Sequence, residues 1–385
     1  MNPSFSLLDE LSAELSDLAA KDLLRTRREL ASAQGPWVEV DGRRLRNFCS
    51  NDYLGLAADS RLKIAAAAAI EQYGLGSGAS HLVCGHQAPH ESLERTFAAF
   101  VGLPASLFFS TGYMANLGVI TALVGRGDAV FADRLNHASL NDACVLSRAD
   151  FHRFPHGDLD ALARQLQASS APRKLIAVDA VYSMDGDLAP VAELLALAER
   201  HNAWLYLDDA HGFGVLGEGR GSLAHWGVAS PRLIYLATLG KAVGAAGALV
   251  AGEQTLIDYL VNKARTAIYT TAMPAAVAAA SEAALAVIAV EAWRRDRLAE
   301  HIARLEAGLR GSNYHLLRSP TPIQPVVVES NARAMSLSQQ LYERGFWVAA
   351  IRPPTVPTPR LRITLSATHE AADVDALVAA LLELQ

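Results

Sequence analysis

Short apolar runs alternate along the middle of the chain with segments in which apolar residues recur at helical spacing. Apolar runs that end at polar or glycine-containing turns are typical of buried strands, whereas a repeat near 3.6 residues predicts an amphipathic helix. The runs predicted to be strands are Ser106–Phe109, Ala129–Ala132, Lys174–Val181, Ala203–Leu207, Leu233–Ala237 and Gly247–Ala251. Helical segments fit between most of them, for example Gly112–Leu123, Leu159–Gln167 and Val191–His201. This alternation predicts an α/β fold with a mostly parallel sheet covered by helices on both faces.

The two ends of the chain have different patterns. Leucines recur at helical spacing from Leu7 and lead into a basic segment, so the region up to Leu30 is predicted to be an amphipathic arm. After Pro274 a long helical pattern runs from Ala275 to Glu300. An α+β pattern follows, with the segments Gln324–Val328, Arg333–Arg344, Trp347–Ile351 and Leu361–Leu365. We therefore expect a helical arm with short strands over residues 1–50, a large domain over 51–285 and a smaller C-terminal α+β domain over 286–385.

The composition narrows the class of protein. The 385 residues are 51% hydrophobic and carry a net charge of -6, which gives no sign of a nucleic-acid partner. Residues Met1 to Phe5 lack a basic segment followed by an apolar core, and the apolar runs elsewhere are interrupted, so we expect neither export nor a membrane span. Three widely spaced cysteines, Cys49, Cys84 and Cys144, favour reduced thiols in the cytoplasm over a disulfide framework or a metal site.

Two polar clusters at predicted strand ends carry the candidate chemistry. Lys241 lies on a small-residue turn after the strand Leu233–Ala237, where poor solvation would make its amine a nucleophile able to bind an aldehyde. Asp208 and His211 follow the strand Ala203–Leu207; a carboxylate there can keep a pyridinium nitrogen protonated, and the imidazole can face the same ring. Taken singly, these residues could be a solvated turn lysine, a helix cap or a metal ligand. Together, beyond the carboxyl ends of strands, they predict a pyridoxal phosphate site without a metal.

The cofactor's phosphate is expected where a strand meets a helix, in the segment Ser110–Asn116. Free backbone N–H groups and the positive end of a helix dipole suit a dianion, and glycine permits close approach. Among the twelve histidines, His137 follows the strand Ala129–Ala132 and is expected at the same sheet edge as Lys241. The ten histidines other than His137 and His211 are predicted to be structural.

These motifs resemble a known family. Asp208–Gly212, Thr238–Lys241 and Ser183–Asp187 are similar to the motifs of the α-oxoamine synthase group of fold-type I pyridoxal phosphate enzymes. The resemblance extends over most of the chain, and it includes the segments Asn51–Leu56, Asp133–Ser139 and Arg360–Arg362. Three places depart from the family pattern: Asp179-Ala180, where Glu-Gly is common, Gly78-Ala79-Ser80, where Gly-Gly-Ser is common, and Ala242-Val243.

The resemblance implies roles for individual residues. The catalytic residues would be Lys241, His137, Asp208 and His211. The cofactor would be bound by Gly112, Tyr113, His137, Ser183, Asp208, His211, Thr238 and Lys241, with His137 stacked on its ring. The substrate would be bound by Arg25, Asn51, His137, Thr355 and Arg362. Arg362 suits a substrate carboxylate, because a guanidinium forms two parallel hydrogen bonds with it.

The resemblance also implies a reaction and an assembly. The segment Ile351–Pro357 is most similar to members of the group that condense L-alanine with pimeloyl-CoA or pimeloyl-[acyl-carrier protein], with loss of CO2, to give 8-amino-7-oxononanoate for biotin biosynthesis. The alternatives are a synthase that uses glycine or serine with another acyl-CoA and a non-catalytic cofactor-binding regulator. A homodimer with active sites at the subunit interface is implied. Thr270 and Thr271 would then either reach the partner's phosphate or form an ordinary helix cap.

Overall fold

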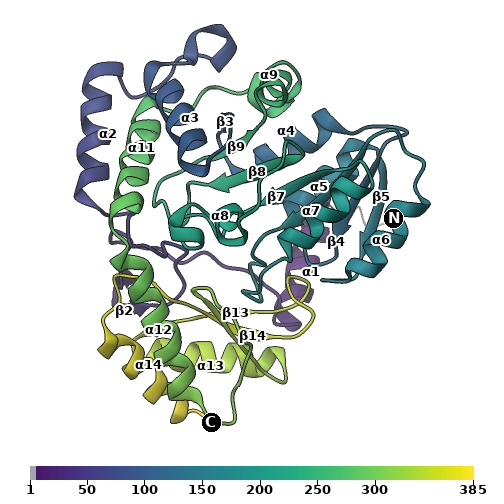
Figure 1. Ribbon diagram of the computed structural model, residues 1–385. Coiled ribbons are helices and arrows are strands. Elements are labelled where there is room, and N and C mark those ends of the chain that lie inside the picture. Colours follow the sequence, from purple (N-terminus) through teal and green to yellow (C-terminus); the bar gives the residue numbers. More distant parts are fainter. Residues whose placement is uncertain (1–5) are drawn as a thin grey trace.

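A computed structural model describes residues 6–385 (Figure 1), so the expectation about Met1 to Phe5 lies outside the described residues. A seven-stranded sheet with the order β3-β9-β8-β7-β6-β4-β5 forms the centre of the larger part. Its strands are β3 (Ala105–Phe109), β4 (Ala129–Asp133), β5 (Asp150–Phe154), β6 (Lys174–Asp179), β7 (Trp204–Asp208), β8 (Leu233–Thr238) and β9 (Ala248–Gly252). Neighbours from β8 to β5 are parallel, and β9 is antiparallel to both β8 and β3. The predicted mostly parallel sheet is confirmed.

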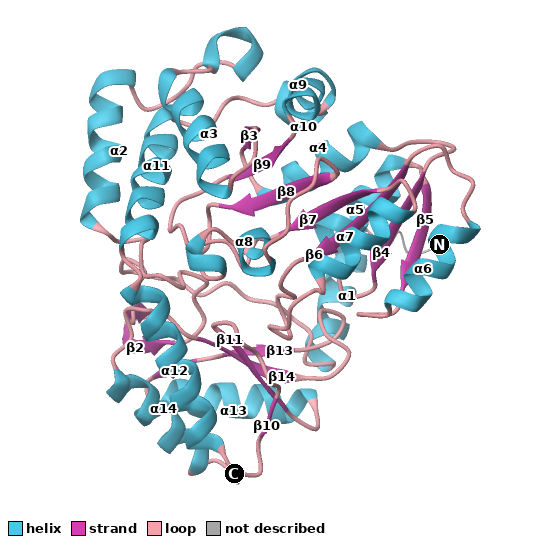
Figure 2. Cartoon of the chain, in the orientation of Figure 1, coloured by secondary structure: helices cyan, strands magenta, loops and turns pink. Residues whose placement is uncertain are grey.

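Helices cover both faces of this sheet, and for this reason its central strands are continuously apolar (Figure 2). Successive residues of β7 show the two-sided packing: Leu205 and Leu207 join one buried cluster, whereas Tyr206 joins the other. The helices of this part are α2 (Ser60–Tyr73), α3 (Ala88–Val101), α4 (Gly112–Leu123), α5 (Ala138–Ser147), α6 (Leu159–Ala168), α7 (Val191–Arg200), α8 (Ser222–Trp226), α9 (Gln254–Lys263), α10 (Arg265–Ile268) and α11 (Ala275–Val290). A π-helix, η1 (His81–Gly85), and a 3-10 turn, η2 (Gly217–Gly219), complete it.

Two smaller sheets lie in the lower part of Figure 1. One is antiparallel, with the order β10 (His315–Leu316), β11 (Ile323–Val327), β14 (Arg360–Thr364) and β13 (Ala349–Ile351). The other joins both ends of the chain, with the order β1 (Trp37–Val40), β2 (Arg43–Asn47) and β12 (Phe346–Trp347). The helices of this region are α12 (Trp293–Leu309), α13 (Asn331–Glu343) and α14 (Ala371–Leu382). The domain boundaries proposed at residues 50 and 285 stay predictions.

Two predicted elements are wrong in extent. The helix expected over Ala275–Glu300 is two helices, α11 and α12, bent by 71°. At the break, the side chain of Arg294 turns inward and donates a hydrogen bond to the carbonyl of Leu54 at 2.5 Å, which stabilises the bend. The strand expected over Trp347–Ile351 is β12 and β13 in different sheets, because the chain changes partner at the buried Val348.

Two further differences concern exposed segments. Strand β5 was not predicted, because its sequence Asp-Phe-His-Arg-Phe is polar and it lies at the edge of the sheet. Helix α1 (Leu7–Ala20) ends ten residues before the predicted end of the arm, and none of its residues is buried. Within residues 6–385 no single helix combines the length and apolarity needed to cross a membrane; the bent pair α11 and α12 meets that test only when both helices are taken together.

Candidate functional site

A cavity of about 200 Å³ lies at the carboxyl ends of the parallel strands. Its walls come from the first turn of α4, the start of α5 and the segments that follow β6, β7 and β8. The residues around it are Gly112, Tyr113, Asn116, His137, Ser139, Asp179, Ser183, Asp208, Ala210, His211, Leu236, Thr238 and Lys241. All eight residues predicted to bind the cofactor are among them, although they are spread over 130 positions of sequence (241 minus 112, counted inclusively).

Lys241 lies on a tight turn between β8 and β9. Its carbonyl accepts a hydrogen bond from the N–H of Gly244, which has a φ of 72°; a Cβ there would lie 2.4 Å from the nitrogen of Ala57. This close packing favours glycine at position 244. Burial lowers the pKa of Lys241 to about 8, although the nearby Asp208 and Asp179 favour the charged form. A substantial fraction of the amine is therefore neutral near physiological pH and can act as a nucleophile.

A chain of hydrogen bonds leads away from Lys241. Its Nζ lies 2.9 Å from Nε2 of His211, and Nδ1 of His211 lies 2.6 Å from the hydroxyl of Tyr53. Burial and the positive charge of Lys241 lower the pKa of His211 well below its usual value, so its imidazole is neutral. The arrangement fits an Nε2 that accepts from Lys241 and an Nδ1–H that donates to Tyr53. Tyr53 in turn donates to Oδ1 of Asn51 at 3.1 Å.

The chain of hydrogen bonds ends at Arg362 on β14. Its Nε donates to the carbonyl of Ser183 at 2.7 Å, and its terminal nitrogens donate to Asn51 and Tyr53 at 3.2 and 3.5 Å. Arg360, on the same face of the strand, instead donates to the carboxylate of Asp185 and the carbonyl of Met184. The side chain of Arg360 is therefore committed to an ion pair. Three of the five N–H groups of Arg362 are used in these contacts, which leaves two for other acceptors.

The carboxylate of Asp208 lies at the end of β7 and is held in place by two donors. Oδ2 accepts a hydrogen bond from the side-chain amide of Asn116 at 2.8 Å, and Oδ1 accepts from the N–H of Ala210 at 3.0 Å. Asn116 is fixed by the hydroxyl of Tyr206, which donates to its Oδ1 at 2.7 Å. These buried contacts orient Asp208 toward the cavity.

His137 caps the start of α5 beside this carboxylate. Its backbone N–H donates to Oδ2 of Asp179 at 2.6 Å, and its Nδ1 lies 2.7 Å from the hydroxyl of Ser139. Burial raises the pKa of Asp179 well above its usual value, and the negative charge of Asp208 raises it further. Asp179, which stands where glutamate is common in the family, thus has its shorter side chain in contact with the backbone of His137.

The N-terminus of α4 faces the other end of the cavity. The hydroxyl of Thr111 caps the helix by accepting from the N–H of Met114 at 3.1 Å, while the N–H groups of Gly112 and Tyr113 belong to the first turn, which lacks intrahelical acceptors. Thr238 donates its hydroxyl to the carbonyl of Gly247, opposite Gly112. An amine, a carboxylate, an imidazole and a helix N-terminus thus surround one cavity, and this set fits pyridoxal phosphate.

Arg25 and Thr355 lie in a different cavity. A guanidinium nitrogen of Arg25 donates to the hydroxyl of Thr355 at 3.3 Å. The space around them measures about 540 Å³ and is lined by leucines of the N-terminal arm and by residues 350–355. The structure brings this predicted pair together but does not place it in the wall of the cofactor cavity.

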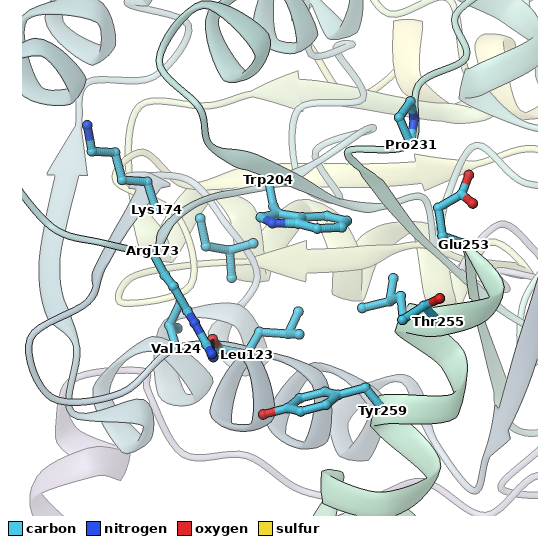
Figure 3. Close-up of a pocket in the computed structure, with 11 residues that line it drawn as sticks. Leu123, Val124, Arg173, Lys174, Trp204, Pro231, Glu253, Thr255 and Tyr259 are labelled. Atoms are coloured by element: carbon cyan, nitrogen blue, oxygen red, sulfur yellow. Dashed lines mark hydrogen bonds between the residues drawn. The ribbon is translucent and has the colours of Figure 1, made fainter.

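A third cavity, of about 480 Å³, lies at the opposite edge of the large sheet (Figure 3). Lys174 and Trp204, the first residues of β6 and β7, line it together with Tyr259 of α9. No predicted site residue contributes to it. Its position at the amino ends of the strands separates it from the candidate active site.

Sequence reasoning missed three residues that support the site: Tyr53, Asn116 and Tyr206. Asn116 lies one helical turn after Gly112 and is buried. A polar amide on the same helix face as Gly112 was the signal in the sequence that could have placed it near the cofactor. Tyr53 lies in the motif that also contains Asn51, yet its contact with His211 joins residues 158 positions apart. Tyr206 lies within an apolar strand, where an aromatic residue is expected for packing alone.

Comparisons with known proteins agree with this geometry. Residues 43–381 match the family Aminotransferase class I and II. The 8-amino-7-oxononanoate synthase of Herminiimonas arsenicoxydans is 57% identical, over 98% of this chain and 99% of its own length. That of Chromobacterium violaceum is 58% identical, over 96% of this chain and 97% of its own length. The chain belongs to the 8-amino-7-oxononanoate synthase family. These enzymes depend on pyridoxal phosphate, and the predicted family and cofactor are confirmed.

Solved structures share the fold over nearly the whole chain. Serine palmitoyltransferase of Sphingomonas wittichii is 30% identical and superposes with a TM-score of 0.93, over 98% of each chain. The 8-amino-7-oxononanoate synthase of Francisella tularensis is 28% identical, with a TM-score of 0.77 over 88% of this chain and 97% of its own. Related structures of serine palmitoyltransferase were solved with PLP. The predicted fold-type I architecture is confirmed.

Proposed function

We propose that the protein joins L-alanine to the acyl group of a pimeloyl thioester, with loss of CO2 and release of the free thiol, to give 8-amino-7-oxononanoate for biotin biosynthesis. The observation that carries this proposal is the convergence of Lys241, His211, Asp208 and His137 around one cavity. The identity of 57% over 98% of the chain to an 8-amino-7-oxononanoate synthase supports the choice of substrates.

Each side chain has a role that follows from its contacts. Pyridoxal phosphate, when bound, supplies an electron sink for the charge left after the α-proton of the amino acid is removed. Asp208 would hold the proton on the ring nitrogen, and His137 would stack on the ring. The amine of Lys241 would hold the cofactor through its aldehyde group and, when released, would carry the α-proton. The neutral Nε2 of His211, 2.9 Å away, would be the next acceptor of that proton.

Recognition of the amino acid is assigned to Arg362 and Asn51. The two unused N–H groups of Arg362 can form parallel hydrogen bonds with the carboxylate of alanine. Its other N–H groups are fixed by Ser183, Asn51 and Tyr53, so the guanidinium is already oriented before the substrate binds. This orientation lowers the entropic cost of binding.

The acyl chain is assigned to the cavity around Arg25 and Thr355. Its leucine-rich wall suits an aliphatic chain, and the hydroxyl of Thr355 and the guanidinium of Arg25 supply polar contacts. Either coenzyme A or the acyl carrier protein can serve as the carrier in this proposal. The two donors are distinguished by comparing their kcat/KM values.

A related activity has one observation in its favour, because the backbone superposes with a TM-score of 0.93 on a serine palmitoyltransferase. Sequence identity favours the alanine reaction, because it is 57% to an 8-amino-7-oxononanoate synthase and 30% to the serine palmitoyltransferase. The test supplies alanine, glycine or serine in turn with pimeloyl-CoA, pimeloyl-[acyl-carrier protein] or palmitoyl-CoA and identifies products by mass. We expect alanine and a pimeloyl thioester to give the highest kcat/KM. Serine with palmitoyl-CoA as the preferred pair would overturn the proposal.

We further propose a cytoplasmic homodimer with active sites at the subunit interface. Thr271 forms an isolated antiparallel bridge with Ser80, and the nearby side chains of Leu82, Val83 and Tyr269 are 57%, 77% and 71% exposed. Contiguous exposed apolar groups are typical of an interaction surface. In this arrangement Thr270 and Thr271 reach the phosphate bound by the partner subunit. The cysteines are free, which agrees with a reducing compartment.

A further inference from the structure

His156 lies two residues after the end of β5, between two carboxylates. Its Nδ1 is 3.2 Å from both oxygens of Asp133, and its Nε2 is 2.8 Å from Oδ2 of Asp187. The ring of Tyr182 meets the imidazole edge to face, with the centroids 4.4 Å apart. Because a carboxylate only accepts hydrogen bonds, both ring nitrogens of His156 must carry protons, and the side chain is an imidazolium.

The two carboxylates belong to segments that carry different site residues. Asp133 ends β4 and accepts the N–H of Leu135 at 2.8 Å, which shapes the turn that leads to His137. Asp187 closes the turn that begins after Tyr182 and contains Ser183; its carbonyl accepts the N–H of Tyr182 at 3.1 Å. His156 therefore connects the turn before His137 with the turn that contains Ser183.

The second turn is also held from its other side. The hydroxyls of Ser319 and Thr321 donate to the carbonyl of Gly186 at 2.9 and 3.2 Å, and Arg362 donates to the carbonyl of Ser183. Those contacts come from the antiparallel C-terminal sheet and its loops. His156 follows a strand of the large sheet and contacts the same turn through Asp187. The turn that contains Ser183 is therefore held by hydrogen bonds from both sheets.

We propose that His156 is a positioning residue, whose imidazolium holds the His137 and Ser183 turns at the separation that the cofactor's ring and phosphate require. The inference rests on the proposed assignment of His137 and Ser183 to the cofactor. It adds a residue outside the cavity that acts through Asp133 and Asp187.

The surroundings of His156 keep it charged at neutral pH. Hydrogen bonds with Asp133 and Asp187 raise the pKa of His156 to about 10, although partial burial opposes the charge. The ionisable groups that face it are Asp133 from β4 and Tyr182 and Asp187 from the turn. The rest of its wall is formed by Gly157 and by apolar residues of β5, β6, α6, α7 and the segment that leads into α7. The imidazolium is thus lost only in alkaline solution.

The test compares His156→Gln with His152→Gln, a matched change at an exposed histidine of β5 that contacts Phe131 instead. Apoprotein is titrated with pyridoxal phosphate to obtain its Kd, and kcat and the KM for alanine are measured separately. In His156→Gln we expect the Kd to rise and kcat to fall by roughly tenfold to a hundredfold, the cost of a small misplacement of site groups. The KM for alanine should change less, because Arg362 keeps its contacts with Asn51 and Tyr53 even where its contact with Ser183 shifts. His152→Gln should match the wild type.

A second variant covers the case in which His156→Gln does not fold. Asp187→Asn removes the charge of one partner but keeps the shape of the side chain, and it should weaken cofactor binding in the same direction. The double variant should be no worse than His156→Gln alone, since both changes break one connection. Additive losses in the double variant would argue against a connection through Asp187.

The pH dependence of unfolding supplies a readout that does not need the cofactor. His156 has a pKa of about 10 in the folded protein against an ordinary value of 6.5, so its stabilisation is complete below about pH 6.5 and is lost as pH rises through about 10. Urea stabilities of wild type and His156→Gln should therefore converge in alkali. If His156→Gln is less stable but binds cofactor and turns over as the wild type does, the positioning role is refuted. Weakened cofactor binding in a protein whose wild type makes no product would instead refute only the proposed function.

Discussion

Asp208 and Asp209 are adjacent in the sequence, but their side chains lie in different environments at the end of β7. Asp208 lines the cofactor cavity, whereas Asp209 is fully buried and accepts hydrogen bonds from Ser222 and Tyr235. Burial raises the pKa of Asp209 to about 6, against the effect of these donors. Of the two carboxylates, only that of Asp208 lines the cavity, and it is the one that we propose contacts the ring nitrogen.

The two aspartates should respond differently to substitution. Asp208→Asn should keep the fold and lose kcat by at least about a hundredfold, because an amide cannot hold the ring nitrogen protonated. Asp209→Asn should cost roughly 1–3 kcal/mol in the free energy of unfolding, because it disturbs a buried hydrogen-bond network. Steady-state kinetics and urea unfolding of both variants check this pair. Near-normal turnover in Asp208→Asn together with lost turnover in a folded Asp209→Asn would reassign the role.

Lys241 is expected to carry the cofactor. Borohydride treatment of the loaded enzyme, followed by peptide mass mapping, should place the pyridoxyl group on Lys241. Lys241→Ala should bind the cofactor without turnover, since the cavity keeps its other groups. A label on another lysine would contradict the assignment.

Cofactor uptake should depend on pH through the amine of Lys241. Because burial lowers its pKa to about 8, the neutral fraction rises from about pH 7 to 9 and then levels off. The rate at which apoprotein captures pyridoxal phosphate at a fixed, low concentration should follow that curve. An uptake rate that keeps rising toward pH 10.5, the ordinary value for lysine, would show that the amine is not desolvated.

Tyr53 should matter although it does not line the cofactor cavity. Tyr53→Phe removes the hydroxyl that contacts His211, Asn51 and Arg362. We expect a stability cost of about 1 kcal/mol and a rise in the KM for alanine, because Arg362 loses part of its support. Tyr73→Phe serves as the control, because Tyr73 is the last residue of α2 and takes no part in these hydrogen bonds. An unchanged KM in Tyr53→Phe would remove this residue from substrate recognition.

The proposed dimer predicts complementation between inactive subunits. Lys241→Ala subunits mixed with a Thr270→Ala and Thr271→Ala variant should regain some activity, because one hybrid site contains only intact residues. Subunit exchange is confirmed separately with differently tagged chains. Hybrids that exchange yet stay inactive, or an active species that sediments as a monomer, would contradict a shared site.

The eight residues predicted to bind the cofactor line one cavity, and they could be grouped from the sequence because each follows a recognisable strand. In a parallel sheet, strand ends meet at one edge, so Asp208, Lys241 and His137 could be grouped from local patterns alone. The contact between Tyr53 and Arg362 could not be predicted in this way, because it joins segments about 300 residues apart. The bend at Arg294 was missed for a related reason: helical periodicity continues through it, and a tertiary hydrogen bond fixes the break.

The position of Arg362 on β14 has a consequence for synthesis of the protein. Translation starts at the N-terminus, so Lys241 leaves the ribosome 121 residues before Arg362 (362 minus 241). The side chain that we assign to the amino-acid carboxylate is therefore the last part of the site to be made. A chain that terminates after residue 345 would still contain every residue assigned to the cofactor, but it would lack the guanidinium that we assign to the carboxylate of the amino acid.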